Sequence, residues 1–373
     1  MSIVPINDLN RLFRSNEGAL TEATQTALAS GWWLNGKQHE AFCEEFAAFV
    51  GARTCVGVAN GTDALEIAMR ALLQVRRPGQ REVITVANAG GYSTIACRLL
   101  GLTPVYADIE EATQLASLKS VVACVSADTA FVVVTHLYGG AIDVPGLRDM
   151  LNEAGHAEIP ILEDCAQAHG ARIGDGIVGS FGDLAAFSFY PTKNLGALGD
   201  AGAVVTSDEE LSAAVNALRQ YGWSAKYHVM EFGGRNSRMD EVQAAALRVL
   251  LPGLPAGNAR RCEIISQYAA AAPEGMSLVD AGNGSVGHLA VVLCSDRDAL
   301  RQHMSSRGVA TEIHYPILDC DQPGWRDLPF KTAPGDLPIS RRSVERIVTL
   351  PCFPDLTDEE VERVCTALSD WQR

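Results

Sequence analysis

The chain has 373 residues, of which 47% are hydrophobic and 20% are charged. At about 150 residues per domain this length predicts roughly two domains, and the composition excludes a largely disordered protein. The 45 acidic and 30 basic residues give a net charge of −15, which argues against a bare nucleic-acid-binding surface. A local basic pocket for a phosphorylated small molecule is compatible with this charge.

The ten cysteines are scattered and form no C-x-x-C pair, so zinc ribbons and thioredoxin-like motifs find no support and no metal site is expected. Scattered cysteines in apolar runs are typical of reduced thiols in a cytoplasmic protein. The first residues show no basic segment followed by an apolar one, and no uncharged apolar run reaches about 18 residues. We therefore expect a cytoplasmic protein without a signal peptide or a membrane span.

Helical and strand-like patterns alternate along the first two thirds of the chain. Residues 17–50 carry apolar side chains at three- and four-residue steps, which predicts helices interrupted around Gly31–Gly36. Helix-period segments such as Asp63–Leu73 and Thr94–Leu100 then lie between short apolar runs. Buried strands joined by helices predict an α/β fold with a mostly parallel sheet flanked by helices. The expected strands are Cys55–Val58, Val83–Val86, Pro104–Ala107, Phe131–Thr135, Ile161–Leu162, Leu184–Phe189 and Ala203–Thr206.

The pattern changes after Thr206, where helices and isolated apolar runs replace the regular alternation. We expect a large α/β domain over residues 1–245, including the N-terminal helical segment, and a smaller C-terminal α+β domain over residues 246–373. The elements expected here are helices over Asp208–Tyr221, Asp240–Leu250, Asp296–Arg307 and Asp358–Gln372 and an apolar run over Leu289–Cys294.

A first candidate site lies where a predicted strand turns into a helix, in the segment Gly57–Leu65. Gly61 forms the turn and the helix opens at Thr62 or Asp63, so free backbone N–H groups and the positive helix end would face outward together. Such a place favours a phosphate, although Thr and Asp are also ordinary helix-capping residues. The segment is not a Walker A loop, because no G-x-x-x-x-G-K-[ST] pattern occurs.

A second candidate site follows the apolar pair Ile161–Leu162. Asp164 would lie at the carboxyl edge of the sheet, where open α/β sheets bind their ligands. Gln167 comes three residues later and would face the same way in a helical turn. A capping or turn role for Asp164 is the alternative interpretation.

The third candidate is Lys193, which follows the apolar strand that ends near Phe189. The chain has five lysines against 25 arginines, so a lysine at this position indicates a function that arginine cannot serve. Schiff-base chemistry is such a function, because it needs a primary amine that can lose its proton. An exposed loop lysine is the alternative. The glycines that follow do not form the dinucleotide-binding pattern, and serine-hydrolase signatures are absent around Ser180 and Ser188.

Together the three sites supply a phosphate cradle, a carboxylate and an amine at strand ends. These are the parts needed to hold pyridoxal 5′-phosphate (PLP): the carboxylate keeps the pyridine nitrogen protonated, and the amine binds the aldehyde and later moves a proton. The sequence therefore predicts a PLP enzyme.

Four segments also resemble the signatures of the DegT/DnrJ/StrS-type sugar aminotransferases, which are fold-type I PLP enzymes. The resemblance runs from about residue 20 to 250 and resumes at Glu312–Pro316 and Leu350–Pro351. Its segments are GTDAL at 61–65, EDCAQAHGA at 163–171, SFYPTKNLGALGDAG at 188–202 and GRNSRMDEVQAA at 234–245.

The resemblance implies a role for each matching residue. Lys193 matches the lysine that binds PLP, Asp164 the partner of the pyridine nitrogen, and Gln167 the glutamine beside the phenolic oxygen. Further matches are phosphate contacts at Gly61, Thr62 and Ser188, and Asn236, which in the family reaches the phosphate from the neighbouring subunit of a homodimer with shared active sites. The family's ring-stacking aromatic is replaced here by glycines, with Tyr92 nearby. His314, Tyr315, Lys226, Tyr227 and Arg238 match positions expected to contact substrate.

The activity implied is transfer of an amino group from L-glutamate to a nucleotide-linked keto-6-deoxysugar, with PLP and its pyridoxamine form as cofactor. A dTDP-3-keto sugar is favoured, and a 4-keto sugar stays open. Three other functions are weighed against it. A sugar dehydratase of the same family would carry histidine in place of Lys193; a PLP-binding regulator would need no turnover; and a Rossmann oxidoreductase would need a G-x-G-x-x-G that is missing.

Overall fold

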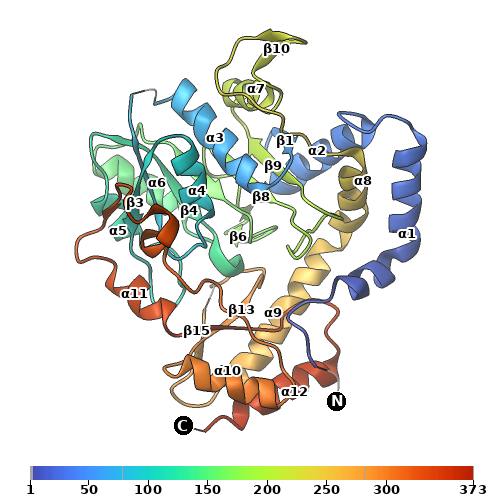
Figure 1. Cartoon of the computed structure of the whole chain (residues 1–373), viewed down its shortest axis with the longest axis vertical. Helices are drawn as coiled ribbons and strands as arrows, with labels where there is room; N and C mark the ends of the chain where they lie inside the picture. The colour runs from blue at the N-terminus through green and yellow to red at the C-terminus, as the bar shows by residue number, and fades with distance from the viewer. Residues whose placement is uncertain (1–2, 78, 281, 373) are drawn as a thin grey trace.

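A large mixed sheet forms the centre of the molecule, and helices cover both of its faces (Figure 1). The computed structural model describes residues 3–77, 79–280 and 282–372. The eight strands have the order β1-β9-β8-β5-β4-β2-β3-β14. They are β1 (Thr54–Val58), β2 (Glu82–Val86), β3 (Thr103–Ala107), β4 (Thr129–Thr135), β5 (Ile161–Asp164), β8 (Leu184–Ser188), β9 (Gly202–Thr206) and β14 (Lys331–Thr332).

The strand pairings confirm the mostly parallel sheet expected from the sequence. In the part of the sheet with the order β8-β5-β4-β2-β3-β14, every neighbouring pair is parallel. Strand β9 runs antiparallel to both β1 and β8. The seven strands predicted from apolar runs are all present, within about two residues at their ends. Strand β14 was not predicted, because it has two residues and joins β3 from a distant part of the chain.

The helices of the large sheet divide between its two faces according to which side chains of the strands they bury. Helices α3 (Gly61–Val75), α4 (Tyr92–Leu99) and α7 (Glu209–Leu218) pack on one face, against residues such as Val83 and Phe131. Helices α2 (Lys37–Val50), α5 (Leu118–Ala123), α6 (Val144–Glu153) and α8 (Glu241–Leu250) pack on the other. Helix α1 (Leu9–Ala29) lies beside α8.

A smaller antiparallel sheet, β12-β13-β15, lies with α9 (Leu254–Ala271), α10 (Arg297–Ser306) and α12 (Asp358–Ser369) at the lower end of Figure 1. Its strands are β12 (Ser277–Leu278), β13 (Ala290–Leu293) and β15 (Ile347–Leu350). The N-terminal segment joins this part, since Val4 bridges Val309 and Arg11 forms an ion pair with Glu360. The division between residues 245 and 246 stays a prediction.

The remaining elements are short. Two hairpins are formed by β6 (Arg172–Ile173) with β7 (Gly176–Ile177) and by β10 (Trp223–Ala225) with β11 (His228–Val229). Helix α11 covers Pro338–Val344, and 3₁₀ turns occur at Leu137–Gly139, Leu251–Gly253, Asp319–Asp321 and Pro323–Trp325. Among the described residues, no helix combines the length and the apolar character needed to cross a bilayer.

An aromatic cluster fixes the strand that leads to Lys193. Phe46 of α2 is fully buried and makes edge-to-face contacts with Phe187 and Phe189, with ring centroids 4.9 and 5.1 Å apart. Edge-to-face geometry adds about 0.5–1.5 kcal/mol per aromatic pair to the free energy gained by burial. The end of β8 is therefore held by a side chain from a helix far away in the sequence.

We expect Phe46→Ala to destabilise the protein by about 3–5 kcal/mol, because it leaves a cavity and removes the two aromatic contacts. Urea denaturation measures this as a fall in the transition midpoint at constant slope. Phe13→Ala is the matched control: Phe13 is 40% exposed on α1, so its loss is expected to cost less than about 1 kcal/mol. Equal midpoints for the two variants would contradict this account of the cluster.

Candidate functional site

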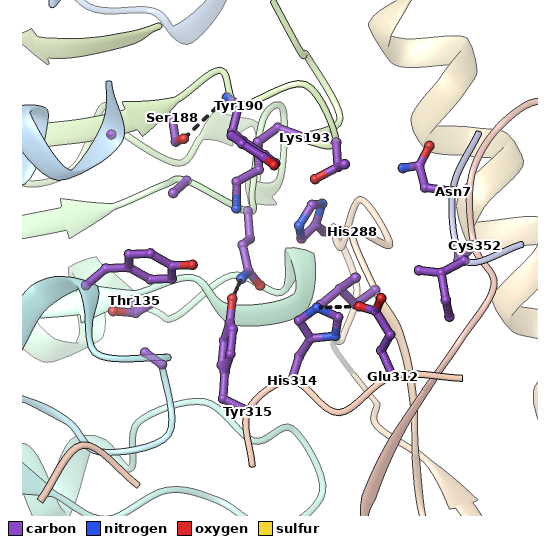
Figure 2. Close-up of a pocket in the computed structure, with 18 of the residues that line it drawn as sticks. Asn7, Thr135, Ser188, Tyr190, Lys193, His288, Glu312, His314, Tyr315 and Cys352 are labelled. Atoms are coloured by element: carbon purple, nitrogen blue, oxygen red, sulfur yellow. Dashed lines mark hydrogen bonds and ion pairs between the residues drawn. The ribbon is translucent and has the colours of Figure 1, made fainter. Parts of the chain in front are cut away.

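A cavity of about 1100 Å³ opens where the central strands of the large sheet end (Figure 2). Thr135, Asp164 and Ser188 are the last residues of β4, β5 and β8, and all three line it. The large sheet and its loops contribute Asn60, Gly61, Thr62, Tyr92, Gln167 and Lys193. The facing wall consists of Asn7, Arg261, His288, Glu312, His314, Tyr315 and Cys352, together with neighbouring apolar residues.

The N-terminus of α3 presents unpaired donors to this cavity. Asn60 caps the helix by accepting a hydrogen bond from the Asp63 amide at 2.8 Å. Gly61 and Thr62, the first two helical residues, have no intrahelical carbonyl for their N–H groups, and both line the cavity. A Cβ atom on Gly61 would lie 2.4 Å from Ser188 Cβ, so only glycine allows this close approach. Backbone amides, the helix dipole and the Ser188 hydroxyl at this place have the chemistry that suits an anion.

Asp164 is a buried carboxylate with one weakly bonded oxygen. Its Oδ1 accepts a hydrogen bond from the Ala166 amide at 3.1 Å, whereas Oδ2 has only long contacts with Thr135 Oγ1 at 3.4 Å and Ser93 Oγ at 3.5 Å. Burial raises the pKa of Asp164, opposed by the Ala166 hydrogen bond and the positive charge of Lys193. An oxygen of this kind is suited to accept a strong hydrogen bond from a cationic N–H.

Lys193 lies in the loop after β8, where its main-chain N–H bonds Tyr190 O at 2.8 Å. Burial lowers the pKa of the Lys193 amine to about 8, and the charge of Asp164 acts in the opposite direction. The amine and the carboxylate interact electrostatically, yet no ion pair joins them within the described residues. The two charges therefore face a shared space.

Gln167 has a fixed orientation in the cavity wall. Its Oε1 accepts a hydrogen bond from the Tyr138 amide at 2.7 Å, and its Nε2 donates to the Tyr315 hydroxyl at 3.0 Å. The Tyr315 ring packs against Gly90, where a Cβ atom would lie 2.9 Å from the ring carbons. The glycines of this loop thus make room for an aromatic ring from a distant segment. Tyr92 contacts the same ring edge-on, with centroids 6.2 Å apart.

His314 also lies in the facing wall (Figure 2). Its Nδ1 is 2.9 Å from Thr349 Oγ1 and its Nε2 is 3.4 Å from a carboxylate oxygen of Glu312. Burial lowers the pKa of His314, while the charge of Glu312 raises it. The predicted pair His314 and Tyr315 is therefore brought to the same cavity as Lys193.

Beneath the cavity, a buried pair fixes the end of β5. Ile142 donates its amide to His136 Nδ1, so the Nε2–H of His136 donates to Glu163 at 3.0 Å. Glu163 also accepts hydrogen bonds from the amides of Gly179, Phe181 and Gly182. These bonds lower the pKa of Glu163 against the effect of burial. The neighbouring Asp164 is thereby held at a defined position.

Four other predicted residues do not line this cavity. Lys226 and Tyr227 are exposed in the hairpin β10–β11, where Tyr227 is 78% exposed. Asn236 is exposed beside Gln220, and Arg238 is half-buried near the Tyr221 ring. Within one chain, the structure does not bring these four residues to Lys193.

The sequence analysis missed several wall residues. His288 is buried, and its Nδ1 lies 2.8 Å from Oδ1 of Asn194, the residue that follows Lys193 in the sequence. Arg261 is 4% exposed and donates to the carbonyl groups of His288 and Cys352. Arg261 belongs to α9, a helix that the sequence analysis did not identify, and nothing in its local sequence distinguishes it.

The sequence profile of the DegT/DnrJ/EryC1/StrS aminotransferase family matches residues 15–369. Among curated relatives, the erythromycin biosynthesis sensory transduction protein EryC1 of Saccharopolyspora erythraea is 37% identical, with 98% of each chain covered. A dTDP-3-amino-3,4,6-trideoxy-alpha-D-glucose transaminase of Micromonospora megalomicea is 36% identical, with 94% of each chain covered. A UDP-N-acetyl-3-dehydro-alpha-D-glucosamine 3-aminotransferase of Acidithiobacillus ferrooxidans is 35% identical over 98% of this chain and 97% of its own.

Two solved structures extend the comparison. DesV of Streptomyces venezuelae, in complex with a ketimine intermediate, superposes with a TM-score of 0.92 at 35% identity over 100% of this chain and 99% of its own. NtdA of Bacillus subtilis, with bound PMP, superposes with a TM-score of 0.88 at 27% identity, over 99% of this chain and 85% of its own. Family profile, full-length relatives and fold agree with the geometry of the cavity. The chain therefore belongs to the DegT/DnrJ/EryC1/StrS aminotransferase family.

Proposed function

We propose that the protein is a PLP-dependent aminotransferase that moves an amino group from L-glutamate to a nucleotide-linked 3-keto-6-deoxysugar, with dTDP as the favoured nucleotide. The observation that carries this proposal is the opposition of the Lys193 amine and the Asp164 carboxylate in one cavity, beside the N-terminus of α3. Relatives that span nearly the whole chain are transaminases of dTDP- and UDP-linked 3-amino sugars, which supports the sugar class.

The residues present fit PLP. Gly61, Thr62 and Ser188 would bind its phosphate through amide and hydroxyl donors, and Asp164 Oδ2 would accept the N–H of its ring nitrogen. When bound, PLP supplies an aldehyde that reacts with amines and a ring that accepts electrons. The Nε2 group of Gln167 would donate toward the phenolic oxygen, since its Oε1 is already bonded to Tyr138. Tyr92, Tyr190 and Tyr315 line the cavity and are aromatic residues that would be available to contact the ring.

Lys193 is assigned two tasks, holding the cofactor and moving a proton. With a pKa of about 8 its amine is neutral in roughly a tenth of molecules at pH 7, whereas an ordinary lysine is neutral in far fewer. A neutral Lys193 amine would accept the proton from the substrate carbon and, once protonated, would act as the acid that donates it again. Asp164 would hold the proton on the ring nitrogen of the bound cofactor, which favours the electron-accepting form of the ring.

The alternative functions find less support. A dehydratase of this family would carry histidine at position 193, and the residue here is lysine. One relative is named as a sensory transduction protein, which keeps a regulatory role as the second candidate. Lys193 and Asp164 would hold PLP in either role, so turnover with an amino donor is what distinguishes the enzyme from a regulator.

The cofactor site is proposed to be completed by a second copy of this chain. Asn236, Lys226, Tyr227 and Arg238 lie outside the cavity of their own chain. The hairpin and the residues directly after it expose the apolar side chains Tyr227, Val229, Met230 and Phe232. Asn236 would reach the phosphate of the partner, and the other three would contact the nucleotide. The ten unpaired cysteines favour a reducing cytoplasm as the location.

The first test separates turnover from binding. Protein loaded with PLP and mixed with L-glutamate alone is expected to release one equivalent of 2-oxoglutarate per site before any sugar is added. Lys193→Arg keeps the positive charge and is expected to release none within the same time, since a guanidinium does not lose its proton. Stopped-flow absorbance and a 2-oxoglutarate assay measure both.

Lys119→Arg, at an exposed lysine, is the matched control and is expected to behave as the wild type. Release of 2-oxoglutarate by Lys193→Arg at the wild-type rate would refute the assignment. A stable cofactor spectrum that does not respond to glutamate would favour the regulatory role.

The second test identifies the sugar. The protein in its pyridoxamine form is offered 3-keto and 4-keto 6-deoxyhexoses, each linked to dTDP or UDP, and the aminated product is identified by mass spectrometry and NMR. We expect amination at C-3 of the dTDP sugar with the highest kcat/KM. Product only from 4-keto sugars would overturn the preference for C-3 and leave the aminotransferase assignment intact.

The third test concerns the shared site. Asn236→Asp places a negative charge against the phosphate, and Lys193→Ala removes the amine, so each variant alone is expected to be inactive. In a refolded equimolar mixture, half of the dimers contain one chain of each variant. Each mixed dimer has one intact site of its two, so about a quarter of all sites, and of the wild-type activity, is expected. An inactive mixture that contains mixed dimers would show that each chain builds its own site.

A further inference from the structure

A second hollow, of about 460 Å³, lies between α2, β1 and α7, and shares no lining residue with the cofactor cavity among those described. Helix α2 carries His39 and Cys43 one turn apart, and the edge strand β1 carries Cys55. These three side chains and Arg219 line the hollow. Figure 1 shows α2 and α7 on either side of β1. The two thiols therefore meet at a surface depression built from three elements.

The geometry around Cys43 is that of an activated thiol. Its Sγ lies 3.6 Å from His39 Nε2, and Cys55 of the neighbouring strand β1 lines the same hollow. The imidazole reaches this position because residue 57 is glycine: a Cβ atom there would lie 2.7 Å from His39 Nε2. The neighbouring Cys55 thiol and the imidazole of His39 lower the pKa of Cys43 against the effect of burial. The neighbouring Cys43 and burial raise the pKa of Cys55.

Arg219 adds a buried positive charge to the hollow. It is 6% exposed, and its guanidinium donates to Gly57 O at 3.2 Å, Asn35 Oδ1 at 3.1 Å and Asn216 Oδ1 at 2.9 Å. Among the described residues, it forms no ion pair within 4.0 Å. A buried cation without a counter-ion stabilises an anion beside it, and the thiols are the groups available. Glu40, Glu44 and Glu209 also line the hollow and oppose this effect.

We propose that Cys43 and Cys55 form a dithiol site that exchanges with low-molecular-weight disulfides. The Cys43 thiolate attacks one sulfur of the disulfide, which forms a mixed disulfide and releases one thiolate. Cys55 then loses its proton to that thiolate and attacks Cys43 Sγ, which forms the Cys43–Cys55 bond and releases a second thiolate. This thiolate takes from solvent the equivalent of the proton that Cys43 lost on ionisation. Two protein thiols are oxidised and one small disulfide is reduced to two thiols. The site is independent of the transaminase chemistry.

Oxidised glutathione is the probe that tests this proposal, applied to the full chain loaded with PLP. Intact-mass analysis is expected to show loss of two hydrogens, and peptide mapping is expected to place the bond between Cys43 and Cys55. In Cys55→Ser the glutathionyl group is expected to remain on Cys43, because no resolving thiol is present. In Cys43→Ser no adduct is expected on the same timescale. Cys262→Ser is the control and is expected to match the wild type, since Cys262 is a half-buried thiol on α9 whose pKa is raised by burial.

The role of His39 has a separate readout. Alkylation of Cys43 by iodoacetamide at pH 7 is expected to be at least about tenfold faster than that of Cys262. His39→Asn is expected to move the midpoint of the pH–rate profile of Cys43 to higher pH, which a packing role would not do. The proposal would be overturned if Cys262 or Cys365 reacted before Cys43, or if His39→Asn left the midpoint of the Cys43 pH–rate profile unchanged. Tightly bound zinc that protects both thiols would also overturn it.

Discussion

The burial of two opposite charges at one edge of a sheet is the constraint on which the rest of this structure depends. Lys193 and Asp164 are removed from water, and each shifts the pKa of the other against the effect of burial. Charges in such surroundings are stable only if a partner or a ligand compensates them. The described residues leave the two groups without a direct bond, so the surrounding structure must hold them apart and in position.

Several parts of the chain meet that requirement. Phe46 supports the strand before Lys193, and the pair His136–Glu163 supports the strand that ends at Asp164. Parallel strands bring their carboxyl ends to the same edge, which places Thr135, Asp164 and Ser188 side by side. The antiparallel strand β9 returns the chain from the Lys193 loop, and Gly202 at its start approaches Asn60 so closely that a Cβ atom would lie 2.4 Å from the Asn60 carbonyl oxygen. Glycine is thus needed on both sides of the α3 N-terminus.

Much of this arrangement could be predicted from the sequence because it depends on local patterns. Buried strands appear as short apolar runs, and Gly61, Asp164 and Lys193 were found because each follows such a run. The positions of β9 and β14 depend on long-range pairing that no local pattern records. Arg261 and His288 reach the cavity only through packing of α9 and β13 against the large sheet. Gly90 and Gly91 stand where the family resemblance predicts an aromatic residue. Gly90 is needed because the Tyr315 ring packs directly against it.

The bond between Gln167 and the Tyr138 amide determines which polarity the cavity offers beside Asp164. A main-chain N–H can only donate, so the side-chain carbonyl of Gln167 is committed; its amino group donates one hydrogen to the Tyr315 hydroxyl and retains a second. A group bound there meets a donor and is favoured when it carries an acceptor such as a phenolate. The backbone of a 3₁₀ turn therefore fixes the orientation of the Gln167 amide, which substitution of surface side chains leaves unchanged.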